Sequence, residues 1–111
     1  MSDPVFRYTL DKTGRPSAHP LAGAHPFLAS FLTEEASWAD YIDMLLDCVA
    51  EAARTGTAQV NTGNAYAVTM DKAHAVIEHL HKKGHPAATV PLPVFTQALR
   101  EWRAFLLKAP P

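Results

Sequence analysis

Acidic residues crowd into one segment of this 111-residue sequence and make it the first candidate for chemistry. Between Thr33 and Ala53 there are six acids and no lysine or arginine, whereas the rest of the chain has five acids and ten bases. The net charge of −1 therefore hides an acidic segment and a basic remainder. Such a separation bears on partners and association rates rather than on the fold. The six acids are Glu34, Glu35, Asp40, Asp43, Asp47 and Glu51.

Four of these acids form a row along a predicted helix of residues 37–54. On a wheel with about 100° per residue they fall within about 80°, opposite the apolar stripe of the same helix. Like charges at this spacing cost about 0.2–0.5 kcal/mol per pair. Arg54 is placed to pair with the last acid, but the two middle acids have no such relief within the helix. The row consists of Asp40, Asp43, Asp47 and Glu51.

This acidic row has a plain and a specific interpretation. It can be a solvated face that keeps the protein soluble. It can also be a recognition surface for a cationic partner, which speeds the encounter and suppresses wrong partners. Basic nucleases are obvious partners, because a protein that grips phosphates must itself present lysine and arginine. The carboxylates would then occupy the nuclease groove in place of phosphates.

Histidines raise the question of a metal site. His79 and His81 share one face of a predicted strand, with His85 in the loop beyond, and they would carry the alternative of a metal-dependent enzyme. A zinc site needs three or four ligands held by orienting partners. The nearby Glu78 points to the other face of the strand, so we interpret these as surface histidines and predict no metal site.

Catalytic and nucleic-acid motifs are also weak. Cys48 lies beside Asp47, whose charge raises a thiol pKa, whereas reactive thiols need cationic neighbours. Five glycines form no phosphate-binding loop, so we predict no catalytic residue, no cofactor and no enzyme activity. A C-terminal basic patch has Trp102 beside it, but this residue falls on an apolar stripe, and the pI of 6.6 argues against direct nucleic-acid binding. The patch comprises Lys82, Lys83, Arg100, Arg103 and Lys108.

Length and composition predict one cytoplasmic domain, residues 1–111. A single cysteine forms no internal disulfide, which favours a reducing compartment. No apolar run approaches the roughly 20 residues that span a bilayer, and the first residues lack the pattern of a signal peptide. We therefore expect no membrane partner.

The hydrophobic pattern predicts an α+β fold, with three helices packed on an antiparallel sheet of about four to five strands. Residues 5–10 alternate as a strand, a turn ends at Gly14, and 16–24 return as an irregular edge strand. Pro26 begins a short helix. Ser37 caps the acidic helix, and Gly56 ends it. Its stripe is Trp38, Tyr41, Ile42, Leu45, Val49 and Ala52.

The second half predicts a meander and a helix. Val60 and Thr62 pair with residues 66–70 around a turn at 62–64, and 75–81 form a further strand, with a short helix as the alternative. Residues 82–86 are a loop. Two prolines then lead into the last helix. Its apolar stripe is Phe95, Ala98, Leu99, Trp102, Phe105 and Leu106.

A set of motifs covers nearly the whole length of the sequence. The motifs are Phe6…Asp11-x-Thr13-Gly14, Gly23-x-His25, Phe31-Leu32-Thr33-Glu34-Glu35, Gly63-x-x-Tyr66-x-Val68-x-Met70-Asp71 and Leu92-Pro93-Val94-Phe95…Leu99-Arg100-x-Trp102-Arg103-x-Phe105-Leu106. Together they resemble the YacL-like family of small bacterial proteins. They occupy packing and turn positions and carry no catalytic group. His25-Pro26 departs from the His-Glu that this family tends to have.

The resemblance implies a function that composition alone does not. Relatives of this kind include immunity proteins of contact-dependent growth inhibition systems, which bind and neutralise a cognate toxin C-terminal domain, often an RNase. The expectation is therefore an immunity protein that uses its acidic row to bind a basic nuclease toxin. A small regulatory or adaptor protein is the alternative.

Overall fold

Three helices and six strands make up residues 3–81 and 87–108, the part of the chain that the computed structural model describes. The α+β class and antiparallel pairing are confirmed, although the strands divide into a four-stranded sheet and a two-stranded hairpin. In chain order the elements are β1 (Phe6–Leu10), β2 (Pro16–Pro20), α1 (Pro26–Glu34), α2 (Ala39–Thr55), β3 (Gln59–Thr62), β4 (Tyr66–Met70), β5 (His74–His79), β6 (Ala88–Pro91) and α3 (Leu92–Lys108).

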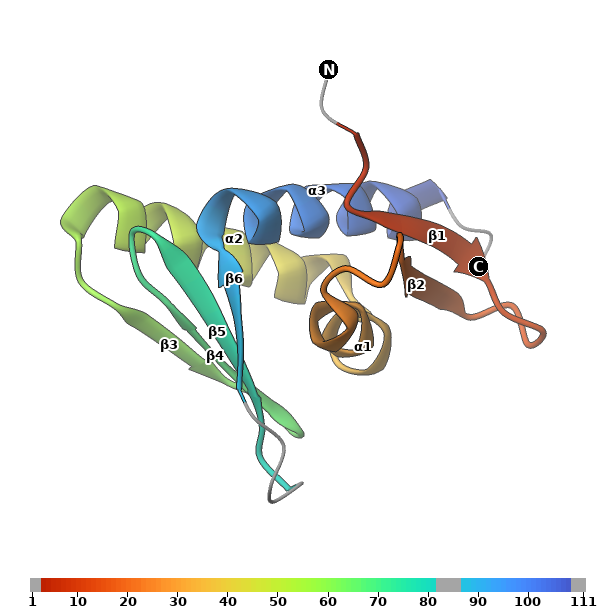
Figure 1. The fold of residues 1–111 in the computed structure, drawn as a ribbon, viewed down its shortest axis with the longest axis horizontal. Coiled ribbons are helices and arrows are strands. Elements are labelled where there is room, and N and C mark those ends of the chain that lie inside the picture. The colour runs from red at the N-terminus through yellow and green to blue at the C-terminus, as the bar shows by residue number, and fades with distance from the viewer. Residues whose placement is uncertain (1–2, 82–86, 109–111) are drawn as a thin grey trace.

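The long helices α2 and α3 lie side by side on one face of the four-stranded sheet, and α1 lies between that sheet and the β1–β2 hairpin (Figure 1). The sheet order is β3-β4-β5-β6. Alternate residues of its central strands are buried, as the period of two requires when one face is covered. These are Tyr66, Val68 and Met70 of β4 and Ala75 and Ile77 of β5, within a hydrophobic cluster that runs from β1 to α3.

In the second half of the chain, the structure decides between two predicted alternatives and adds one strand that the sequence does not predict. Residues 74–79 form a strand, so the alternative of a short helix there is wrong. β6 was not predicted, because four residues between prolines are too few to show an alternating pattern. It forms by pairing with β5, Val90 opposite Ala75. The predicted loop at 82–86 lies outside the described residues.

α2 begins later than its sequence indicates. Trp38, and not Ser37, is the N-cap, with an extended backbone and no side-chain cap. Because Trp38 precedes the first helical residue, helical periodicity does not govern its direction, and its side chain is 70% exposed rather than buried. The other end is as predicted: Gly56 adopts φ of 72°, and its amide donates to the carbonyl of Ala52.

Two glutamates at the end of α1 hold the turn between β3 and β4. The Glu35 carboxylate accepts hydrogen bonds from the amides of Asn64, Ala65 and Tyr66, the last at 2.6 Å. The Tyr66 hydroxyl donates to the Glu34 carboxylate. A carboxylate that accepts several amide hydrogen bonds fixes the turn firmly, because each such bond is charge-assisted. The turn is thereby fixed relative to α1.

Trp102 joins α3 to the chain between α1 and α2. Its side chain is 1% exposed, which confirms its predicted place in the core. The indole Nε1–H donates to the carbonyl of Ala36 at 2.6 Å. None of the helices in the described residues has the length and apolarity that crossing a membrane requires.

The two tryptophans give a matched test of this packing. Trp102→Phe should lower the free energy of unfolding by about 1–3 kcal/mol, because the Ala36 carbonyl loses its donor inside the core. Trp38→Phe should change it by less than about 0.5 kcal/mol, since that side chain is exposed. Urea unfolding followed by circular dichroism measures both, and equal effects would contradict the assigned roles.

Candidate partner-binding surface

The outer side of α2 carries the four acids of the acidic row, opposite the helix's buried residues. Asp40 and Asp47 are exposed, whereas Asp43 and Glu51 are partly buried. The burial difference separates the row into two pairs with different surroundings. The structure therefore keeps the row on one surface but gives its members unequal roles.

Asp43 is bound by an arginine of the neighbouring helix. The Arg103 Nε donates to Asp43 Oδ1 at 2.6 Å, and Nη2 donates to Oδ2 at 3.2 Å. This bidentate geometry is the most directional form of an ion pair. The hydrogen bonds and negative charge of Asp43 raise the pKa of the Arg103 guanidinium above its ordinary value. Asp43 thus connects α2 to α3 as well as facing solvent.

Glu51 is also paired, by the arginine predicted for it. Arg54 Nη2 and Nε both donate to the Glu51 carboxylate, three residues earlier on α2. Within the described residues, Asp40 and Asp47 form no hydrogen bond and no salt bridge, so we call them the open carboxylates of the row. The charge of Asp40 contributes, after that of Asp43, to the raised pKa of Arg103. A cationic partner would meet the open carboxylates first, because the other charges are already compensated.

Apolar groups lie directly beside the open acids. Met44, 44% exposed, is four residues after Asp40 and three before Asp47, so the three side chains are neighbours on the helix surface. The Asn61 Nδ2 of β3 approaches Met44 Sδ at 3.8 Å. The Tyr41 hydroxyl donates to Asn61 Oδ1 at 3.0 Å. Aromatic and methionine side chains within a charged rim are typical of protein–protein interfaces.

Sequence reasoning missed this aromatic edge because it assigned Trp38 to the buried stripe. The signal lay in the helix start: a residue before the first turn does not follow the helical wheel. Trp38 and Tyr41 lie against the β3–β4 turn, and Tyr41 and Met44 contact Asn61 of β3. The candidate surface is therefore mixed rather than purely acidic.

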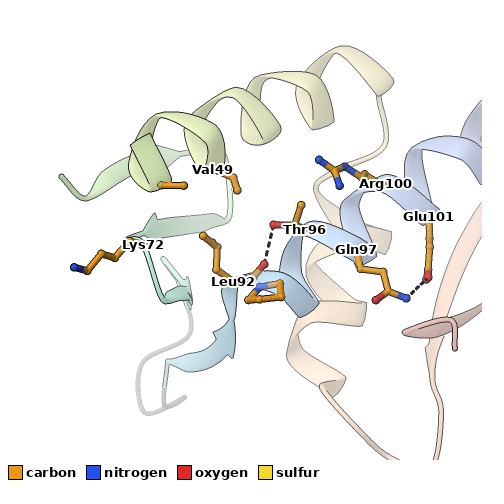
Figure 2. A pocket seen from close by; sticks show the side chains of 9 residues that line it. Val49, Lys72, Leu92, Thr96, Gln97, Arg100 and Glu101 are labelled. Atoms are coloured by element: carbon orange, nitrogen blue, oxygen red, sulfur yellow. Dashed lines mark hydrogen bonds between the residues drawn. The ribbon is translucent and has the colours of Figure 1, made fainter. Parts of the chain in front are cut away.

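A groove lies between α2 and α3, away from the acidic row (Figure 2). It has a volume of about 640 Å³. Arg100 projects from α3 toward α2, and Lys72 stands at the opposite end. The groove's acid, Glu101, accepts hydrogen bonds from the Tyr8 hydroxyl at 2.5 Å and from the Gln97 amide at 2.7 Å. Glu101 therefore connects α3 to β1.

The predicted histidine pair has local structural partners. The His79 and His81 rings lie 6.1 Å apart, and the His81 amide donates to His79 Nδ1 at 3.1 Å. The His79 ring also meets Tyr66 edge to face at 4.8 Å. Among the described residues no group of three histidine, cysteine or acidic side chains is placed to hold a metal ion. His85 lies outside those residues.

Other residues considered at the sequence level have local positions. Cys48 is partly buried, and burial first, then Asp47, raises the pKa of its thiol, in the predicted direction. The Asp71 carboxylate accepts hydrogen bonds from the amides of Ala73 and His74, so it closes the β4–β5 turn. The basic patch does not stay together: Arg100 lines the groove between α2 and α3, Arg103 pairs with Asp43, and Lys108 ends α3. The lysines at 82 and 83 lie outside the described residues.

Comparison of the chain with protein-family models, with curated proteins and with solved structures gave no match. The candidate surface is therefore interpreted from its own residues and contacts.

Charge reversal should affect stability in opposite directions at two neighbouring positions. Asp43→Lys places a cation against Arg103, so it should lower the free energy of unfolding, most at low salt. Asp47→Lys relieves like-charge repulsion and gains acidic neighbours four residues away on both sides, so stability should stay equal or rise. Urea unfolding at low and high salt measures both changes. A loss of stability in Asp47→Lys as large as that in Asp43→Lys would contradict the assignment.

All three tyrosines should resist ionisation in the folded protein. Burial first, and then a nearby glutamate, raises the pKa of Tyr41 to about 12 and raises the pKa of Tyr8 and of Tyr66 well above the ordinary value. Unfolded tyrosines ionise near pH 10. Since the unfolded state releases protons first, stability should be fully present below about pH 10 and decline as pH rises toward 12.

Ultraviolet absorbance of tyrosinate, followed together with circular dichroism, measures this alkaline transition. Ionisation should coincide with loss of structure rather than precede it. Independent titration of all three tyrosines near pH 10 in folded protein would contradict the prediction.

Proposed function

We propose that this protein is an immunity protein that binds and neutralises a cationic toxin domain, a nuclease, through the outer surface of α2. The observation that carries the proposal is the pair of open carboxylates, Asp40 and Asp47, beside the exposed Met44 on α2, with the exposed Trp38 at the start of the same helix. Carboxylates steer a cationic partner, and the apolar groups supply contact area once it arrives.

The ion pair of Asp43 with Arg103 supports a rigid binding surface. It fixes α2 against α3, so the open acids are presented on an element that need not reorder when the partner binds. Rigid presentation lowers the entropic cost of association. The same arginine also breaks the acidic row, which favours a partner whose cations match the spacing of Asp40 and Asp47 over an arbitrary polycation.

The choice of a toxin nuclease as the partner comes from the motifs that resemble the YacL-like family. Two of those motifs contact each other: Glu34 and Glu35 of the first bind the Gly63–Tyr66 turn of the second. They build the support beneath the aromatic edge of the surface. Inhibition would be stoichiometric, with the carboxylates occupying cationic phosphate sites of the toxin.

The proposal predicts that a toxin domain is encoded beside this gene, and the test uses that domain. The variant Asp40→Lys/Asp47→Lys should lose protection of cells that express the toxin, and its association rate should fall at least about tenfold at low salt. Both measurements follow from the loss of electrostatic steering. Surface plasmon resonance over a salt series gives the rate, and co-expression gives protection.

A matched control makes the same change in net charge at positions outside α2. The variant Asp3→Lys/Glu78→Lys alters two exposed acids outside α2, and it changes the net charge by the same amount as the double variant of α2. This control should bind as the unaltered protein does. If the double variant is folded and binds with unchanged rate and affinity, the acidic surface is not the interface. A partner encoded elsewhere would favour the regulatory adaptor.

A further inference from the structure

Trp38 has an exposure that the fold does not require. Its side chain is 70% exposed, whereas the chain's other tryptophan, Trp102, is 1% exposed. Tryptophan is highly buried on average and is enriched at the centres of protein interfaces. An exposed indole at the start of α2 is therefore the strongest single indication of a contact site.

A small pocket lies next to this indole. It has a volume of about 200 Å³ and is lined by Glu35, Trp38, Tyr41, Gly63 and Asn64. Pockets for drug-sized ligands are about 300–1,000 Å³. This one is closer to the size of a single long side chain. Two of its five lining residues are aromatic, and one is a carboxylate.

The carboxylate side of the pocket is rigidly built. Glu35 is held by the three amides of the β3–β4 turn, so its position does not depend on a ligand. At Gly63 an added Cβ would lie 3.0 Å from Glu35 Cδ and 3.1 Å from Oε2, so a glycine allows the turn to approach the carboxylate. The pocket is thus organised before anything enters it.

The pocket also contains a formal negative charge. Backbone amides hold the Glu35 carboxylate, and no cation pairs with it among residues 3–81 and 87–108. That charge, after burial, contributes to the raised pKa of Tyr41. Asp40, in the first turn of α2, offsets the positive end of the helix dipole. A cation is the occupant that these charges favour.

We propose that this pocket receives an arginine side chain of the partner, with its guanidinium against the Trp38 ring and near Glu35. The inference rests on the proposed function, because it names an anchor for the same cationic partner. Arginine fits better than lysine, since its planar guanidinium stacks on aromatic rings and is more weakly hydrated. A purely apolar side chain would desolvate Glu35 without compensation.

The test needs no toxin and uses the isolated chain. The probe is a capped tripeptide with a central arginine, compared with the same peptide carrying citrulline, which has nearly the same shape but no charge. Each is titrated to tens of millimolar while the two indole N–H signals are followed by nuclear magnetic resonance. Trp102 serves as an internal reference, because it is buried and hydrogen-bonded to Ala36.

The arginine peptide should shift the Trp38 signal in a saturable way and leave the Trp102 signal in place. Citrulline should bind about two- to fivefold more weakly, as expected for loss of a cation–π contact at an exposed site. Trp38→Leu, followed through the amide signals of Gly63 and Asn64, should weaken arginine binding, and Trp38→Phe should restore part of it. Leu107→Ala, which alters a side chain 62% exposed on α3, should have no effect.

Three outcomes would overturn the arginine anchor: no shift of Trp38 with arginine, an equal response to citrulline, or unchanged binding by Trp38→Leu. None of them bears on Asp40 and Asp47, whose role is judged by charge reversal with the toxin. If Asp40→Lys/Asp47→Lys loses toxin binding and the peptide titration is negative, the acidic surface remains supported as the interface and only the arginine anchor is excluded.

Discussion

Three consecutive residues at the end of α1 fix the positions of the sheet, α1 and α3 relative to one another. Glu34 and Glu35 bind the β3–β4 turn through a tyrosine hydroxyl and three backbone amides, and the Ala36 carbonyl accepts the indole N–H of Trp102. The sheet, α1 and α3 therefore converge on one short stretch of chain. Because that stretch runs directly into α2, its constraints decide where α2 begins and where Trp38 emerges.

The same stretch explains why the candidate surface has two parts. Glu35 faces the turn and forms one side of the aromatic pocket, while the acids of α2 begin five residues later with Asp40. The pocket therefore lies at the N-terminal end of α2, with Asp40 in the first turn of the helix and Asp47 two turns further along. A partner that docks on this region would meet a fixed aromatic anchor and a charged rim, an arrangement in which specificity and affinity come from different groups.

The ion pair between Asp43 and Arg103 changes which acids of the row are available to a partner. Viewed along α2 alone, the four acids form an uninterrupted strip. The packing of α3 brings a guanidinium to the second acid, and Arg54 compensates the fourth. The open negative charge is therefore concentrated at Asp40 and Asp47, with Met44 between them. Exposed carboxylates such as these affect stability little, because solvent and salt screen their charges, but they shape the electrostatic potential of this surface.

Much of the fold follows from local patterns in the sequence. The α+β class, the β1–β2 hairpin, the stripe of α3 and the end of α2 at Gly56 all depend on periodicity, proline positions and turn residues. Those signals depend on a few neighbouring residues, so they can be recognised in the sequence alone. The sequence did not reveal β6, because this short strand depends on pairing with β5 and on burial of Val90 in the core, and both are long-range contacts.

The sequence by itself determined that acids gather on one side of α2 and that Trp102 belongs to the core. Only the tertiary structure decided which acids stay open, since the partner of Asp43 lies 60 residues away on another helix. It also placed Trp38 outside, because the contacts of residues 34–36 set the helix start after that residue. The charge and the periodicity of side chains can be read from the sequence. Whether a charge is paired, and whether a side chain is exposed, depends on which distant residues the fold places next to it.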